Sequence, residues 1–139
     1  MKERVASQSL VLGRLLYFFA AYTVLIKYIL PIAWAVLQKV SLTSYIYFWD
    51  AWWLAHLIVG FHLVRCTPGI WKWAILLALT EIGIISTKFA IYFQNPAGDF
   101  WHWNWFVNKL LLLFYFLTLL FWLLHREVQT ALRDEKKKS

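Results

Sequence analysis

The sequence is poor in the residues that build most catalytic and metal sites. Its single cysteine, Cys66, excludes an internal disulfide and any metal site made of several cysteines of one chain. It has no glycine-rich phosphate loop, no nucleophile motif, and no histidine and carboxylate spaced as metal ligands on one helix face. The sequence therefore predicts no metal and favours a protein that is not an enzyme. The alternative is an enzyme acting on lipid through His56, Glu81 or Asp50.

Acidic residues are also scarce, with 7 Asp and Glu against 14 Lys and Arg, and the formal net charge is +7. A basic protein of this kind is a candidate for nucleic-acid binding when its charges form a stripe or patch. Here the basic residues stand in short blocks beside apolar runs. This pattern is typical of charges that flank membrane spans, and we expect no nucleic-acid partner.

Apolar side chains are abundant: 62% of the residues are hydrophobic and 20% are aromatic, more than a soluble domain usually carries. A helix crosses a bilayer with roughly 20 mainly apolar residues. The segments of this length are residues 15–37, 45–64, 70–93 and 101–125. Turn signals with proline and glycine connect the later ones, at 65–69 and 95–99. The sequence predicts an all-α integral membrane protein whose single domain, residues 1–139, is an antiparallel bundle of four transmembrane helices.

The run FWHWNWFVNK, residues 100–109, alternates aromatic and polar side chains in the manner of a strand. An open strand edge is not tolerated in lipid, and the apolar run that follows has helical length. We therefore interpret it as the start of the last helix. At about 100° per residue, Trp101, Trp103 and Trp105 then spread around the helix and suit the rim of a span.

The first apolar segment is interrupted by Lys27 but then continues through YILPIAWAVL, which makes it too long for a secretory signal. It also has no clear cleavage site. We interpret it as a retained helix. Pro31 cannot donate a hydrogen bond to the carbonyl of Lys27, four residues earlier, so a kink is expected beside this lysine.

Lys and Arg in short loops resist translocation and thus indicate orientation. With four spans, most of the basic residues outside the spans fall on one side and Lys39 falls on the other. Both termini are therefore expected in the cytoplasm. A bacterial inner membrane is favoured, although the ending KKKS resembles the dilysine retrieval signal of endoplasmic reticulum proteins, which would apply in a eukaryote.

Ionisable residues inside the spans are the main candidates for function, because they are costly in lipid and normally face protein or water. They are Lys27, Asp50, His56, Glu81, Lys88 and Lys109. At about 1.5 Å per residue, Lys27, His56 and Glu81 lie roughly 15 to 18 Å from the outer end, near the midplane. Asp50 and Lys88 lie at roughly 7 or 8 Å. We expect Lys27 to pair with Glu81 beside His56, and Asp50 to pair with Lys88.

Two interpretations of this network stay open. In the structural one, the pairs fix the register of the helices. In the functional one, Glu81 and His56 exchange protons at mid-membrane, which would suit a small transporter or channel-like protein.

A second candidate site lies at the opening of the last helix, where polar side chains follow one another among tryptophans. These are His102, Asn104, Asn108 and Lys109. We expect them to meet an anion, a lipid headgroup or an acidic residue of another subunit.

No cofactor is expected, and haem b is the alternative considered. Its ligands would be His62 and His125, which fall near the cytoplasmic ends of parallel helices.

The aromatic residues at the outer ends of the second and fourth spans exceed what an interfacial belt requires. Such surface predicts packing against another membrane protein or a second copy of the chain, besides the lipid bilayer. The most favoured function is a non-catalytic accessory or assembly subunit of a larger membrane complex. The alternatives are the transporter and a protein that binds or modifies lipid or binds haem.

Overall fold

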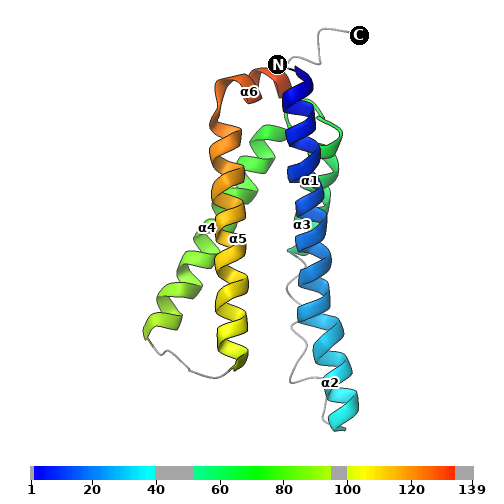
Figure 1. The fold of residues 1–139 in the computed structure, drawn as a ribbon, viewed down its shortest axis with the longest axis vertical. Coiled ribbons are helices and arrows are strands. Elements are labelled where there is room, and N and C mark those ends of the chain that lie inside the picture. The colour runs from blue at the N-terminus through cyan, green and yellow to red at the C-terminus, as the bar shows by residue number, and fades with distance from the viewer. Residues whose placement is uncertain (1, 40–51, 95–99, 134–139) are drawn as a thin grey trace. The chain divides into compact units, whose positions relative to one another are not determined.

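The computed structural model describes residues 2–39, 52–94 and 100–133, with the backbone alone at residues 2, 31 and 100–105 (Figure 1). Every regular element in these ranges is a helix, so the all-α prediction is confirmed for them. The elements are α1 (Lys2–Val24), the π-helical turn η1 (Leu25–Ile29), α2 (Leu30–Gln38), α3 (Trp53–Val64), α4 (Ile70–Gln94), α5 (Phe100–Leu124) and α6 (Arg126–Arg133).

Within the described residues, three helical stretches are long and apolar enough to cross a membrane: Glu3–Gln38, Ile70–Gln94 and Phe106–Leu124. α4 and α5 begin and end within one residue of the positions expected from the sequence. The helix expected over 45–64 is described only as the 12-residue apolar α3. Residues 45–51, which complete that expected span and include Asp50, lie outside the described residues.

The first helix begins at Lys2, well before the apolar run that starts near residue 15. Residues 2–12 contain no glycine or proline, and most of them have high helix propensity. Hydropathy finds only the apolar part of such a helix, which explains why the sequence places its start too late.

The same helix departs from α geometry beside Lys27, where the sequence predicts a kink. Leu25–Ile29 forms a π-helical turn, and the amide of Leu30 donates to the carbonyl of Leu25, five residues earlier. Pro31 follows as the second residue of α2. Because proline supplies no amide hydrogen, a wider turn ahead of it is one way to re-satisfy the backbone.

The chain forms two compact units, Ala6–Cys66 and Met1–Val5 with Thr67–Ser139, which we call the N-terminal and C-terminal units. The single bundle of four spans stays a prediction. In the N-terminal unit, α1 crosses α3 at small residues. A Cβ atom on Gly13 would lie 2.8 Å from the carbonyl oxygen of Gly60, and one on Gly60 would lie 3.0 Å from that of Gly13. Two helices approach this closely only where side chains are absent.

In the C-terminal unit, α4 and α5 are antiparallel neighbours joined through residues 95–99 (Figure 1). Each has one buried face with the three- and four-residue spacing of a packed helix. On α4 the face is Ile70, Ala74, Leu77, Ala78, Glu81 and Ile85; on α5 it is Leu112, Tyr115, Phe116, Leu119 and Leu123.

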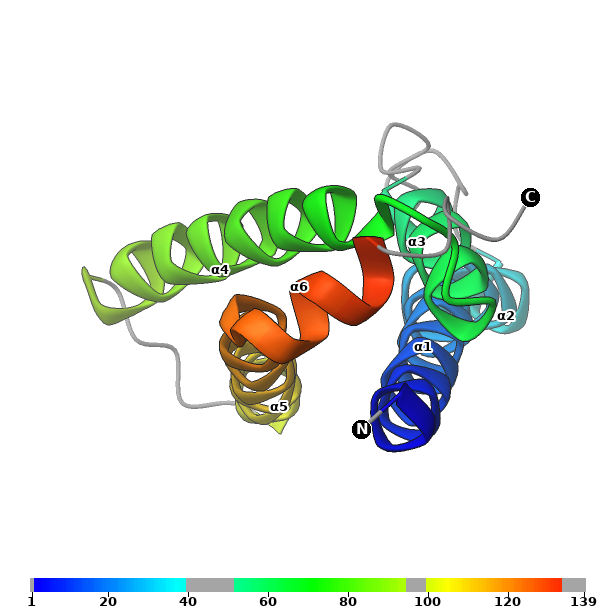
Figure 2. The same cartoon turned by 90° about the horizontal axis from the view of Figure 1, so that it is seen from above.

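The chain turns sharply at His125, and α6 then runs across the end of α5 towards the start of α4 (Figure 2). Val128 and Leu132 form its buried side. The side-chain amide of Gln129 donates to the carbonyl of Leu123, one of the last carbonyls of α5. Residues 126–133 therefore form an amphipathic helix that packs on the unit.

Candidate functional site

The clearest polar feature inside the predicted spans is Glu81, near the middle of α4. Its side chain is only 7% exposed and belongs to the buried face, between Ala78 and Ile85. A carboxylic group at this place is costly unless another group shares its charge or hydrogen bond. Glu81 is thus a functional candidate on position and burial together.

The register of α4 against α5 identifies a residue at the same level. Near the end of α4 and the start of α5, the ring of Phe89 on α4 lies 5.3 Å from that of Phe106 on α5, centre to centre. Counting eight residues back from Phe89 reaches Glu81, and counting eight or nine forward from Phe106 reaches Phe114 or Tyr115. Tyr115 is on the buried face of α5 and is 8% exposed. A phenol that can donate a hydrogen bond therefore stands level with the carboxyl group.

The rest of the predicted charge network is divided between the two units. Lys27 lies half-buried in η1, and His56 lies buried on α3, both in the N-terminal unit. Glu81 and the half-buried Lys88 belong to the C-terminal unit. The pairing of Lys27 with Glu81 stays a prediction, and so does that of Lys88 with Asp50, which lies outside the described residues.

At the opening of α5, Asn108 and Lys109 are half-buried, whereas the side chains of His102 and Asn104 lie outside the described part. Phe106, three residues before Lys109, packs among rings of α4. Its centroid lies 5.5 Å from that of Tyr92 and 6.1 Å from that of Phe93, in addition to Phe89. Sequence reasoning singled out the neighbouring tryptophans and missed this phenylalanine, because Phe106 does not share the three- and four-residue spacing of the buried face of α5.

The two histidines considered for haem lie in different units. His62 is half-buried on α3, with its ring 5.4 Å from that of Phe61. His125 is exposed at the bend after α5, with its ring 5.3 Å from that of Phe121. Each makes an edge contact with an aromatic ring nearby in sequence. Across the described ranges, no group of three or more His, Cys, Asp or Glu residues is placed to hold a metal ion.

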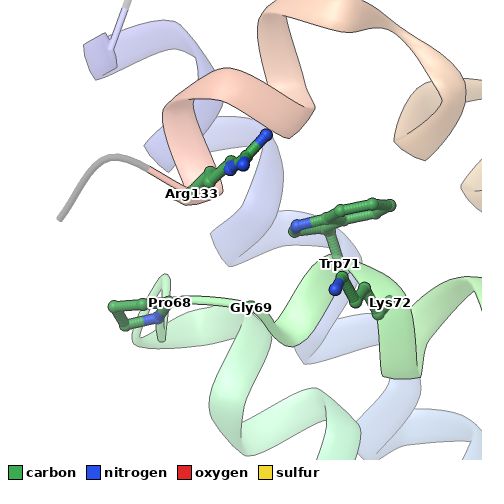
Figure 3. A pocket seen from close by; sticks show the side chains of 5 residues that line it. All are labelled: Pro68, Gly69, Trp71, Lys72 and Arg133. Atoms are coloured by element: carbon green, nitrogen blue, oxygen red, sulfur yellow. The ribbon is translucent and has the colours of Figure 1, made fainter. Parts of the chain in front are cut away.

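A pocket of about 400 Å³ lies where α4 begins and α6 ends. It is lined by Pro68, Gly69, Trp71, Lys72 and Arg133 (Figure 3). Gly69 has a φ of 81°, which favours glycine, and its amide donates to the carbonyl of Leu132 at 3.2 Å. This bond joins the turn before α4 to the end of α6. The sequence shows the Pro-Gly turn and both cations, but only the reversal at His125 brings Arg133 to the pocket.

Comparison of the chain with protein-family models, with curated proteins and with solved structures finds no match. The function of the protein is therefore inferred from the residues of this chain alone.

Proposed function

We propose that the chain is an integral membrane protein that crosses the bilayer four times, with both termini in the cytoplasm. Three helical stretches of sufficient length and apolar character support this placement. α3 with the residues before it would supply the remaining span. The basic residues at the two ends of the chain and in the link at 65–69 are those expected to stay on the cytoplasmic side.

Labelling of single cysteines tests the span count, because Cys66 is the chain's one native thiol. In a C66S background, a membrane-impermeant maleimide applied to intact cells should label Gly98→Cys. Ser139→Cys should react only after the membrane is opened. If α3 does not cross while the N-terminus stays in the cytoplasm, these two positions exchange sides, and the reversed labelling pattern would contradict four spans.

Within that membrane we propose that the protein is a non-catalytic accessory or assembly subunit of a larger complex. The subunit role is supported by a continuous apolar face of α1, η1 and α2, whose large side chains are exposed on the surface of the single chain. Its exposed large residues alternate at intervals of four and three over most of the helix, with the ring of Tyr22 stacked 6.1 Å from that of Phe18. They are Val11, Leu15, Phe18, Leu25, Ile29, Ile32 and Val36.

An alternation of four and three is the spacing by which one helix packs along another. Small residues on another face of α1 already pack against α3, so the exposed face is free for a further helix. We propose that its partner is a transmembrane helix of another subunit.

Site-specific photo-crosslinking in native membranes tests this role. A crosslinking residue at position 18 or 29 should capture one protein of constant mass. Positions 91 and 121, which carry equally exposed Ile91 and Phe121 on other helices, serve as matched controls. Capture of lipid alone from all four positions, or purification of the chain as a homogeneous homo-oligomer, would refute the subunit role.

A small proton-coupled transporter is the second candidate, and the burial of Glu81 near mid-helix is the observation that favours it. Proton uptake by proteoliposomes should then depend on Glu81 and disappear in Glu81→Gln. A flux equal to that of protein-free vesicles in the unmodified chain would exclude this function.

A further inference from the structure

The pocket between the start of α4 and the end of α6 gathers positive charge at one place. Lys72 stands in the first turn of α4, and Arg133 comes from the last turn of α6; both line the pocket at the Pro68–Gly69 turn (Figure 3). Both side chains are exposed, and none of the five lining residues is acidic. Two cations that line one pocket repel each other, and an anion bound between them offsets this repulsion.

The backbone of the pocket favours an anion as well. α4 is a helix of 25 residues whose first turn holds no acidic side chain, so the positive end of its dipole meets no carboxylate of that turn. The amides of Gly69, Ile70 and Lys72 already donate to the carbonyls of Leu132, Thr67 and Gly69, so the helix contributes through its dipole. Arg133 adds a planar guanidinium, the group that best matches the oxygens of a phosphate.

Trp71 gives the pocket an apolar wall. Its side chain is half-buried, and the Nζ atom of Lys72 lies 5.6 Å from the centre of its ring. Tryptophan with a neighbouring lysine is typical of the level where hydrocarbon meets headgroups. Ile70–Gln94 is itself a candidate span, so the pocket opens at the end of a membrane-crossing helix.

We propose that this pocket binds the phosphate of an anionic phospholipid, with Lys72 and Arg133 on the phosphate oxygens and Trp71 beside the upper part of the lipid. A volume of about 400 Å³ is that of a small-ligand site and suits one headgroup. The site rests on the membrane placement of α4 and is independent of the role as a subunit. Its failure would therefore leave the subunit role standing, and the reverse also holds.

Native mass spectrometry of the full chain in an uncharged detergent tests the site directly. After removal of bound lipid, the protein is titrated with phosphatidylglycerol and, separately, with phosphatidylcholine of the same acyl chains. The unmodified protein should prefer phosphatidylglycerol. The K72Q/R133Q variant should bind it about 10- to 30-fold more weakly, from two lost charges.

The matched control is R4Q/R126Q, which removes the same charge from exposed arginines that do not line the pocket. It should bind phosphatidylglycerol within twofold of the unmodified chain. Equal losses in both double variants would show that net charge acts without a site. Equal affinity of the unmodified chain for the two lipids would likewise overturn the proposal.

Inorganic phosphate distinguishes a lipid from a soluble ligand. Phosphate at millimolar concentration should leave phosphatidylglycerol bound, because the acyl chains and Trp71 add contacts that the free ion lacks. Displacement of the lipid at that concentration would identify a water-soluble phosphate compound as the ligand and overturn the lipid assignment.

Asp134 and Glu135 follow Arg133 in the sequence and lie outside the described residues. Their neutralisation provides a test of opposite sign. The D134N/E135Q variant should bind phosphatidylglycerol at least as tightly as the unmodified chain. Weaker binding would mean that these acids, and not the cations, hold the ligand.

Discussion

The hydroxyl of Ser9 on α1 donates a hydrogen bond to the carbonyl oxygen of Leu63 on α3 over 2.6 Å, and both residues are fully buried. Leu63 is in the last turn of α3, where carbonyls have no partner further along the helix. The amide of Cys66 also reaches this oxygen, at 3.0 Å. The bond therefore ties the end of α3 to α1, a few residues from the crossing at Gly13 and Gly60.

Replacement of Ser9 by alanine should lower the stability of the N-terminal unit by about 0.6 to 1.5 kcal/mol, because a buried carbonyl loses one donor. Unfolding of the purified chain in mixed micelles with increasing denaturing detergent measures this. Ser7→Ala is the matched control, since Ser7 is exposed on the same helix. Equal midpoints for the two variants would contradict a stabilising role of the bond.

Alanine at Gly13 should destabilise the chain by about 1 to 3 kcal/mol through overpacking. Its Cβ atom would lie 2.7 Å from Cγ2 of Val64 and 2.8 Å from the carbonyl oxygen of Gly60, so α1 and α3 must separate. The comparison is Gly83→Ala, where a Cβ meets nothing within 4 Å. That change should be neutral or stabilise α4 by up to about 1 kcal/mol, since alanine favours a helix. The same unfolding assay applies, and a tolerated alanine at Gly13 would disprove the close crossing.

Glu81 and Tyr115 should be energetically coupled, because they stand level on the buried faces of adjacent helices. A double-mutant cycle of Glu81→Gln and Tyr115→Phe should give an interaction energy of about 0.5 to 2 kcal/mol. A parallel cycle of Glu81→Gln and Lys27→Met tests the charge pair expected from the sequence. Additive losses in either cycle would remove that residue as the partner of Glu81.

Shortening Leu132 to alanine should release α6, because this side chain is 1% exposed and anchors the helix beside Val128. Trypsin should then cut faster after Arg126, and amide hydrogens of residues 126–133 should exchange faster. Leu124→Ala makes the same chemical change at a side chain that is 57% exposed, and it should leave both rates unchanged. Unaltered exchange in the Leu132 variant would show that α6 is held by other contacts.

Apolar runs of sufficient length, bounded by turn residues, identified α4 and α5 almost to the residue, because a long apolar helix can be recognised without knowing what it packs against. The irregular turn near Lys27 was also readable, since proline removes an amide wherever it occurs. Hydropathy did not reveal the polar start of α1, and it did not reveal that α6 folds back onto α5 and α4. In both, ordinary helix propensity and amphipathic packing decide the structure.

By itself the sequence determined the class of protein: helical, apolar, basic at its ends, and carrying a few ionisable groups within its apolar helices. Those properties follow from composition and from spacing along one helix. Only the tertiary structure decided which residues meet, such as Ser9 with Leu63, Gly13 with Gly60, and Leu132 with the turn at Gly69. Such contacts join residues dozens of positions apart, and they depend on helix rotation and crossing, which no single helix encodes.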